Sequence, residues 1–419
     1  MTDNKHIRFP INIAEAQGAY HLELLVGSQQ IPLKLLIDTG SSTIAFHPNS
    51  YSTDKDHNVA VTQIAQCVTY GIGGWAGPVL NSTITYSNGV DQFEVHDAFF
   101  SIIENEKGKN FLNLDGILGL AYHHLNKGYH MESYFEAEHV DETHTYPWAF
   151  NEQIQQTGID AFKKFIVKFP EKDITPSFTA FAEQNVSMNK FALSVHRSIV
   201  YVPQNNMTLE QKEAEPLNQG LFVIGDAEAE KDLYVGAPQA VKVVHDAYYN
   251  TNLLSVKVAG FDAIQAPPLD DKHVHNFFSN AIIDSGCSYL MLQKEIYQYV
   301  INAFKAIDPN FIDFIESFKH SQANQSAYIP EGLNLALWPD LFFTFEGVDN
   351  VTVTLRCCPD HYWQLDALGP GQAFFTLLEQ IPKWPDQSLI GLPIISSYFC
   401  IFDRACGKDG VIKFAEKLS

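Results

Sequence analysis

The chain has 419 residues, more than the roughly 250 to 300 at which one hydrophobic core stops growing, so two domains or lobes are expected. Hydrophobic residues make up 46% of the chain, which excludes a disordered protein and supplies material for packed sheets. The 27 Lys and Arg residues against 49 Asp and Glu residues give a net charge of -22, which argues against nucleic acid and anionic membranes as partners.

Nothing in the sequence indicates export or a membrane span. The first residues, MTDNKHIRFPINIAEAQGAYHLELLVG, contain no apolar segment of a signal peptide, and no stretch reaches the roughly 18 uninterrupted apolar residues of a membrane helix. The cysteines form no C-x-x-C pair, so neither a zinc site nor a disulfide framework is predicted. We therefore expect a protein of a reducing compartment, placed in the cytoplasm.

Along the chain, strand patterns dominate. Short apolar or alternating runs are broken by Gly, Pro, Asn and Asp, as in AYHLELLVGSQQIPLKLLID (19–38) and NVTVTLRC (350–357). Helical spacing is clear only in 146–169 and in 294–318. The polar segment 199–219 fits either a connection or a surface insertion. The pattern predicts a mainly β protein.

One motif occurs twice. LIDTGSSTIAF at 36–46 returns as IIDSGCSYLML at 282–292, and each copy has a downstream companion, DGILGLAY at 115–122 and SLIGLPII at 388–395. Two related β-rich lobes follow, each presenting one carboxylate where a strand meets a turn. We predict an N-terminal lobe over residues 1–198, which carries Asp38, and a C-terminal lobe over residues 199–419, which carries Asp284.

Two such carboxylates can share one proton, because like charges about 3 Å apart do not both ionise easily. The ionised group then acts as a base toward a water molecule while its protonated neighbour polarises a carbonyl, which is amide hydrolysis without a metal. Gly40 and Gly286 allow the backbone to turn beside each Asp. Thr39 and Ser285 offer hydroxyls that can fix the two loops.

These motifs resemble those of the pepsin-like aspartic proteases, and the resemblance covers nearly the whole chain. It includes the two Asp motifs with their companions, TYGIGG (69–74) in the place of the flap, FVIGDAEAEKDLYVGA (222–237), YYNTNLLSVKVAG (248–260) and FDRACGKDGVIKFAE (402–416). The fold that it implies is bilobal, with a central cleft and a flap hairpin. The implied activity is endopeptidase cleavage of an extended polypeptide at acidic pH, sensitive to pepstatin-type inhibitors, with large hydrophobic residues around the cut.

The resemblance also implies roles for single residues. Asp38 and Asp284 are the expected catalytic pair, and Ser41 is expected to bond the outer oxygen of Asp38. The expected supporting residues are Thr39, Gly40, Ser41, Ser285, Gly286 and Cys287. Tyr70, Gly71 and Gly73 are the expected flap and substrate contacts. No cofactor and no metal are implied, and a monomer suffices because both motifs lie in one chain.

The sequence departs from the family pattern at three positions. Cys287 stands where the family usually has Thr or Ser, and Leu392 stands where an Asp is common. Both changes disfavour the ionised form of Asp284, so its pKa is expected to be raised and the pH optimum to be less acidic than that of gastric enzymes. Ala45 replaces a Trp that usually braces the flap tyrosine, a role that Trp75 could take.

Only 37 residues precede Asp38, so we expect no prosegment, and we expect a bacterial member of the family. Two other functions stay open. One is a catalytically weak or inactive peptide-binding module of the same fold. The other is an ATPase like actin or the sugar kinases, which also uses two D-x-G turns related by pseudo-symmetry.

Two further segments have a preferred explanation. The histidines between 123 and 144 are irregularly spaced in a polar loop, so solvation is preferred to a metal site. Residues 158–189 form an insertion relative to the family that is expected to fill its own local core, although its amphipathic part could also shape the cleft or bind a partner.

Overall fold

The computed structural model describes residues 6–70, 73–108, 111–139, 144–382 and 384–418. The chain divides into two compact units, one formed by His21–Asn189 and the other by Met1–Tyr20 together with Lys190–Ser419. The expected boundary at 198/199 therefore falls inside the second of these units. Strands dominate both units, which confirms the prediction of a mainly β protein.

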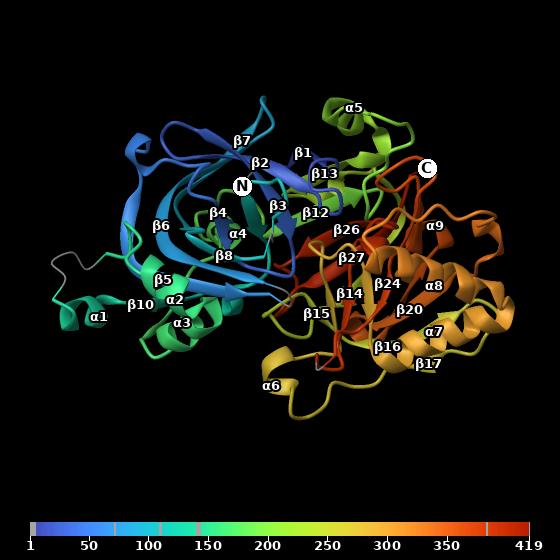
Figure 1. Ribbon diagram of the computed structural model, residues 1–419. Coiled ribbons are helices and arrows are strands. Elements are labelled where there is room, and N and C mark those ends of the chain that lie inside the picture. The colour runs from blue at the N-terminus through green and yellow to red at the C-terminus, as the bar shows by residue number, and fades with distance from the viewer. Residues whose placement is uncertain (1–5, 71–72, 109–110, 140–143, 383, 419) are drawn as a thin grey trace. The chain divides into compact units, whose positions relative to one another are not determined.

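In the unit 21–189 one long sheet runs in the order β11-β10-β5-β6-β7-β4-β9-β3-β2. It closes on itself because β6 also pairs with β2, through Leu25 opposite Thr85 (Figure 1). The strands are β2 (His21–Val26), β3 (Ile31–Asp38), β4 (Ile44–Phe46), β5 (Ala60–Thr69), β6 (Gly74–Ser87), β7 (Gln92–Ile102), β8 (Asn105–Lys107), β9 (Gly116–Gly119), β10 (Lys127–His130) and β11 (Glu171–Asp173). The helices are α1 (Glu132–Ala137), α2 (Asn151–Thr157), α3 (Ile159–Ile166) and α4 (Ser177–Glu183).

In the other unit a sheet runs in the order β1-β13-β12-β26-β27-β14, and three smaller sheets accompany it. These are β15-β18-β25-β19-β24, β17-β16-β20-β21 and β22-β23. The first strands are β1 (Ile7–Asn12), β12 (Lys190–Val195), β13 (Gln219–Ile224), β14 (Tyr234–Lys242), β15 (Asn250–Thr251), β16 (Leu253–Val258), β17 (Ile264–Gln265), β18 (Ala281–Ile283) and β19 (Leu290–Leu292). The later strands are β20 (Leu341–Glu346), β21 (Thr352–Cys357), β22 (Trp363–Leu365), β23 (Ala373–Phe375), β24 (Leu377–Glu379), β25 (Ser388–Ile390), β26 (Tyr398–Asp403) and β27 (Val411–Lys417).

The helices of this unit are α5 (Leu209–Ala214), α6 (Val274–Phe277), α7 (Lys294–Ile307), α8 (Asn310–Ala323), α9 (Pro359–Tyr362) and α10 (Leu392–Ile395). Each of the two expected helical stretches is present but interrupted. Gly158, with a φ of 83°, separates α2 from α3, and Asp308 with Pro309 separates α7 from α8. A left-handed glycine and a proline are both residues that end a helix, because the first leaves the helical region and the second lacks an N–H.

The segment 199–219 contains helix α5, which begins with a capping box between Thr208 and Gln211. All six cysteines are free thiols. Among the described residues, no helix is both long and apolar enough to cross a bilayer.

Candidate active site

Asp38 closes the buried strand β3. Leu35, Leu36 and Ile37 are each at most 8% exposed, so the strand carries the carboxylate into the interior, where Asp38 itself is 8% exposed. The backbone then turns, and the N–H of Gly40 donates to Oδ1 of Asp38 at 2.7 Å. A buried carboxylate is stabilised by such a bond, because a backbone donor replaces water at the oxygen.

The segment DGILGLAY (115–122) holds the loop after Asp38 in place. Strand β9 runs parallel to β3 with Gly119 opposite Asp38. A Cβ on Gly119 would lie 2.4 Å from the backbone nitrogen of Thr43, so only glycine permits this approach. Ser42 Oγ donates to the carbonyl of Tyr122 at 2.5 Å, which ties the same two segments together. The expected support of the Asp38 loop by this strand is confirmed.

The expected hydrogen bond from Ser41 to Asp38 is not formed. Ser41 is 8% exposed, and its Oγ has no hydrogen-bond partner in the part of the chain that the structure describes. Its carbonyl instead accepts from the N–H of Ala121 at 2.7 Å, so the residue contributes to the loop through its backbone. Thr39 is fully buried beside it.

The second motif repeats this geometry within its own unit. Asp284 directly follows β18, which runs parallel to β25, and the N–H of Gly286 donates to Oδ1 of Asp284 at 2.9 Å. A Cβ on Gly391 would lie 2.2 Å from the carbonyl oxygen of Cys287, which is the counterpart of the close approach at Gly119. Asp284 is half-buried and Ser285 is 2% exposed.

Two neighbours of Asp284 hold its loop from other parts of the unit. Ser288 Oγ donates to the carbonyl of Gly18, which ties the N-terminal segment to the loop. Cys287 Sγ donates to the carbonyl of Tyr289 at 3.4 Å, and Leu392, which is 1% exposed, donates its N–H to the carbonyl of Cys287 at 2.8 Å. The two departures from the family pattern are therefore in contact with each other.

Tyr70 and Gly73 lie at the end of the hairpin formed by β5 and β6. The N–H of Tyr70 donates to the carbonyl of Gly73 at 3.1 Å, while Gly71 and Ile72 lie outside the described residues. Trp75, fully buried, donates its Nε1–H to the Tyr70 hydroxyl at 3.0 Å. Trp75 thus braces the tyrosine in this chain, where Ala45 offers no indole.

The pKa of Tyr70 is affected by Asp38, which belongs to the same unit, 21–189. Burial of the ring and the negative charge of Asp38 both raise the pKa of Tyr70 above its usual range, with burial the larger cause. The raised pKa keeps the phenol in its neutral form, which can donate a hydrogen bond.

Comparisons with known proteins identify the family of this chain. The family model described as eukaryotic aspartyl protease matches residues 179–416, which is more than half of the chain and includes the Asp284 loop. The chain belongs to the eukaryotic aspartyl protease family. This membership confirms the resemblance to the pepsin-like proteases and the fold that it implies.

The chain is also similar to a curated protein. The protein described as beta-secretase from Strongylocentrotus purpuratus is 23% identical over 305 residues, which cover 68% of this chain and 45% of that protein. The chain therefore spans about half the length of the curated relative that it matches.

Sequence reasoning missed one contact near the hairpin of this family member. Lys163, on helix α3, donates to Oγ1 of Thr69 at 2.5 Å, directly before Tyr70. The apolar face of α2 and α3, with Ile154 and Phe162, packs on Cys67 of β5, so the insertion fills a local core as expected. That core lies against the strand that carries the flap (Figure 1). The amphipathic pattern of 158–166 was the available signal, but it does not name its partner.

Proposed function

We propose that the protein is an aspartic endopeptidase in which Asp38 and Asp284 share one proton. The observation that carries the proposal is the matched pair of loops, each with a glycine N–H bonded to Oδ1 of its Asp. In each loop this bond occupies one oxygen and leaves the carboxyl group oriented by the backbone. Family membership and the beta-secretase relative support the same reaction class.

In the proposed reaction, the ionised carboxylate takes a proton from a water molecule, whose oxygen then attacks the peptide carbonyl carbon. The protonated carboxyl group donates to the carbonyl oxygen, so that charge does not accumulate on the tetrahedral intermediate. The proton taken from water passes to the leaving nitrogen as the C–N bond breaks. Neither a metal nor a covalent intermediate takes part in this scheme.

The Tyr70 hairpin is proposed to cover an extended polypeptide. The neutral phenol and the backbone at Gly73 supply polar contacts, while Gly71 and Gly286 are proposed backbone contacts to the substrate. Preference for large hydrophobic residues around the cut, an acidic pH optimum, pepstatin sensitivity and a monomeric state remain predictions. The cytoplasmic location stays a prediction as well.

A peptide-binding module without catalysis is the second candidate. The unpartnered hydroxyl of Ser41 and the thiol at Cys287 are the observations in its favour, because both alter the polar surroundings of an Asp loop. The ATPase alternative is not supported, since the chain belongs to a protease family. The test that separates binding from catalysis is turnover of a fluorogenic peptide with a Phe-Phe bond between pH 3 and pH 8.

Replacing Cys287 with Thr is expected to move both limbs of the pH-rate profile to lower pH, by about one unit. A hydroxyl beside Asp284 stabilises the ionised carboxylate, which lowers its pKa, and one pKa unit corresponds to about 1.4 kcal/mol, the size of one hydrogen bond to a charged group. The profile of kcat/KM measures this shift. Cys406→Thr, at an exposed cysteine, is the control, and limbs that stay in place would refute the role of Cys287.

The bond between Trp75 and Tyr70 is expected to couple the two residues in catalysis. Trp75→Phe and Tyr70→Phe each remove the same hydrogen bond, so their effects on kcat/KM should be less than additive by about 1 kcal/mol. A double-mutant cycle on a fluorogenic peptide measures this coupling. Strictly additive losses would show that the indole does not orient the phenol during turnover.

A further inference from the structure

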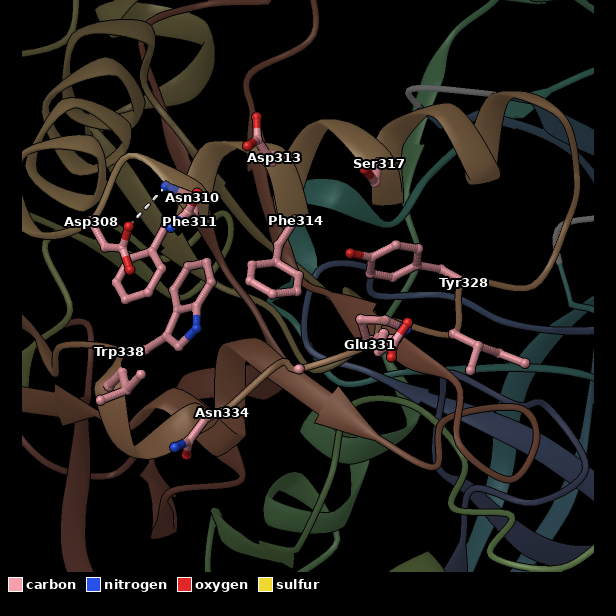
Figure 2. A pocket seen from close by; sticks show the side chains of 14 residues that line it. Asp308, Asn310, Phe311, Asp313, Phe314, Ser317, Tyr328, Glu331, Asn334 and Trp338 are labelled. Carbon is pink, nitrogen blue, oxygen red and sulfur yellow. Dashed lines mark hydrogen bonds between the residues drawn. The ribbon is translucent and has the colours of Figure 1, made fainter.

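A pocket of about 560 Å³ lies in the unit that contains residues 190–419, between helix α8 and the segment 328–338 (Figure 2). Phe314 projects from α8 between Trp338 and Tyr328. Phe311 and Trp338 also line the pocket, and their rings stack with centroids 4.1 Å apart and an angle of 10° between the planes. The aromatic wall is thus held rigid by packing, since Trp338 is 5% exposed.

The charged side chains of the pocket are all acidic. Asp308, Asp313 and Glu331 line it, and no Lys, Arg or His is among the described residues that do so. Figure 2 shows Glu331 across from Phe314, whereas Asp313 points away from that ring. Glu331 forms no ion pair with any described residue. Asp308 lies at the other end of the pocket, where it accepts from the N–H of Asn310 at 2.9 Å (Figure 2).

Two large apolar side chains flank the same pocket and are exposed to water. Ile329 is 66% exposed and Leu337 is 61% exposed, although both belong to residue types that are mostly buried. Exposed apolar side chains at the rim of an aromatic pocket are typical of a surface that binds another chain. The carboxylates favour a bound group with positive charge, and the aromatic rings favour a cation that lies over their faces.

We propose that this pocket docks an extended polypeptide segment in which a lysine or arginine stands next to a large apolar residue. The cationic head is held by Glu331 and by the ring of Phe314 (Figure 2). The apolar neighbour covers Ile329, which directly follows Tyr328 in the wall of the pocket. This docking site lies on the α8 side of its unit and uses none of the residues assigned to catalysis, so it does not depend on the proposed function.

The test is fluorescence anisotropy with labelled octapeptides and the full-length Asp38→Asn protein, which prevents cleavage during the measurement. One peptide has a central Lys-Phe pair, and its partner has norleucine in place of lysine. The lysine peptide is expected to bind roughly tenfold more tightly than the norleucine peptide, because one ion pair and one cation–π contact are lost.

Variants assign the binding to this pocket. Glu331→Gln is expected to weaken only the lysine peptide, by roughly tenfold. Ile329→Ser is expected to weaken both peptides. Glu316→Gln is the matched control, since it removes a carboxylate that lies on α8 outside the pocket and should leave both affinities unchanged.

Three outcomes would overturn the proposal. Equal binding of the two peptides would remove the charge argument, and unchanged binding by Glu331→Gln would place the peptide elsewhere on the protein. Displacement by butylamine as effective as by unlabelled lysine peptide would show a small-amine site instead of a polypeptide dock. Because the readout is binding, each of these results leaves the proposed peptidase activity untouched.

Discussion

Asp38→Asn and Asp284→Asn are each expected to lower kcat by on the order of 10³- to 10⁴-fold, with little change in thermal stability. Asparagine keeps the shape of the side chain, and its carbonyl can still accept from the N–H of Gly40 or Gly286. It can neither take a proton from water nor hold the shared one, so the acid–base contribution to the rate is lost. Hydrolysis of a fluorogenic peptide between pH 3 and pH 8 measures the effect.

Asp349→Asn is the control for this pair of variants. Asp349 is exposed and has a φ of 54°, a conformation that asparagine tolerates well, so the same chemical change should leave turnover intact. Pepstatin should abolish the wild-type activity. Residual turnover above about a tenth of the wild-type rate in either active-site variant would contradict a shared-proton mechanism. Absence of turnover in a folded wild-type protein would favour the binding module.

Gly119→Ala and Gly391→Ala are each expected to destabilise the protein by about 3 kcal/mol, which corresponds to roughly 6 to 12 °C in melting temperature. A Cβ at Gly391 would lie 2.2 and 2.3 Å from the carbonyl oxygens of Cys287 and Tyr289. Because those contacts are with backbone, no side-chain rotation relieves them. The loop that carries the Asp has to move instead, so turnover should fall together with stability.

The matched control for these two variants is Gly260→Ala. At Gly260 an added Cβ meets nothing within 4 Å, but the φ of 87° strains any other residue. The expected cost is about 1 kcal/mol of backbone strain without loss of turnover. Scanning calorimetry compares the three variants. If Gly119→Ala and Gly391→Ala melt like the control, the close approach of strand and loop is not what fixes the Asp residues.

The features around each Asp could be predicted from the sequence because they are local. Three aliphatic residues before Asp38 predict a buried strand, and the hydroxyl-rich turn with Gly40 predicts the reversal. The repeat at Asp284 adds the expectation of a second, equivalent loop, and the companions around Gly119 and Gly391 were identified by their spacing. The structure bears out both companion strands, which run parallel to the strands that end at the Asp residues.

Other features depend on contacts that sequence patterns do not specify. The indole of Trp75 meets Tyr70 only because β5 and β6 pair with Thr69 opposite Gly74. Lys163 reaches Thr69 across 94 residues of chain, and the buried hydroxyl of Ser41 has no partner among the residues that the structure describes, against expectation. Such contacts are set by the direction of side chains in the packed state, which residue types alone leave open.

By itself the sequence determined the chemistry of this protein: two carboxylates on repeated strand-to-turn motifs, a mainly β fold and membership in a protease family. The fold class and the motifs follow from the short-range periodicity of apolar residues, from the positions of the glycines and from a repeated motif. All three can be read from the order of residue types. Only the tertiary structure decided that Trp75 braces the flap, that α3 supports the same hairpin, and that Ile329 and Leu337 stay exposed to water. The reason is physical, since burial and hydrogen bonding are properties of neighbours in space.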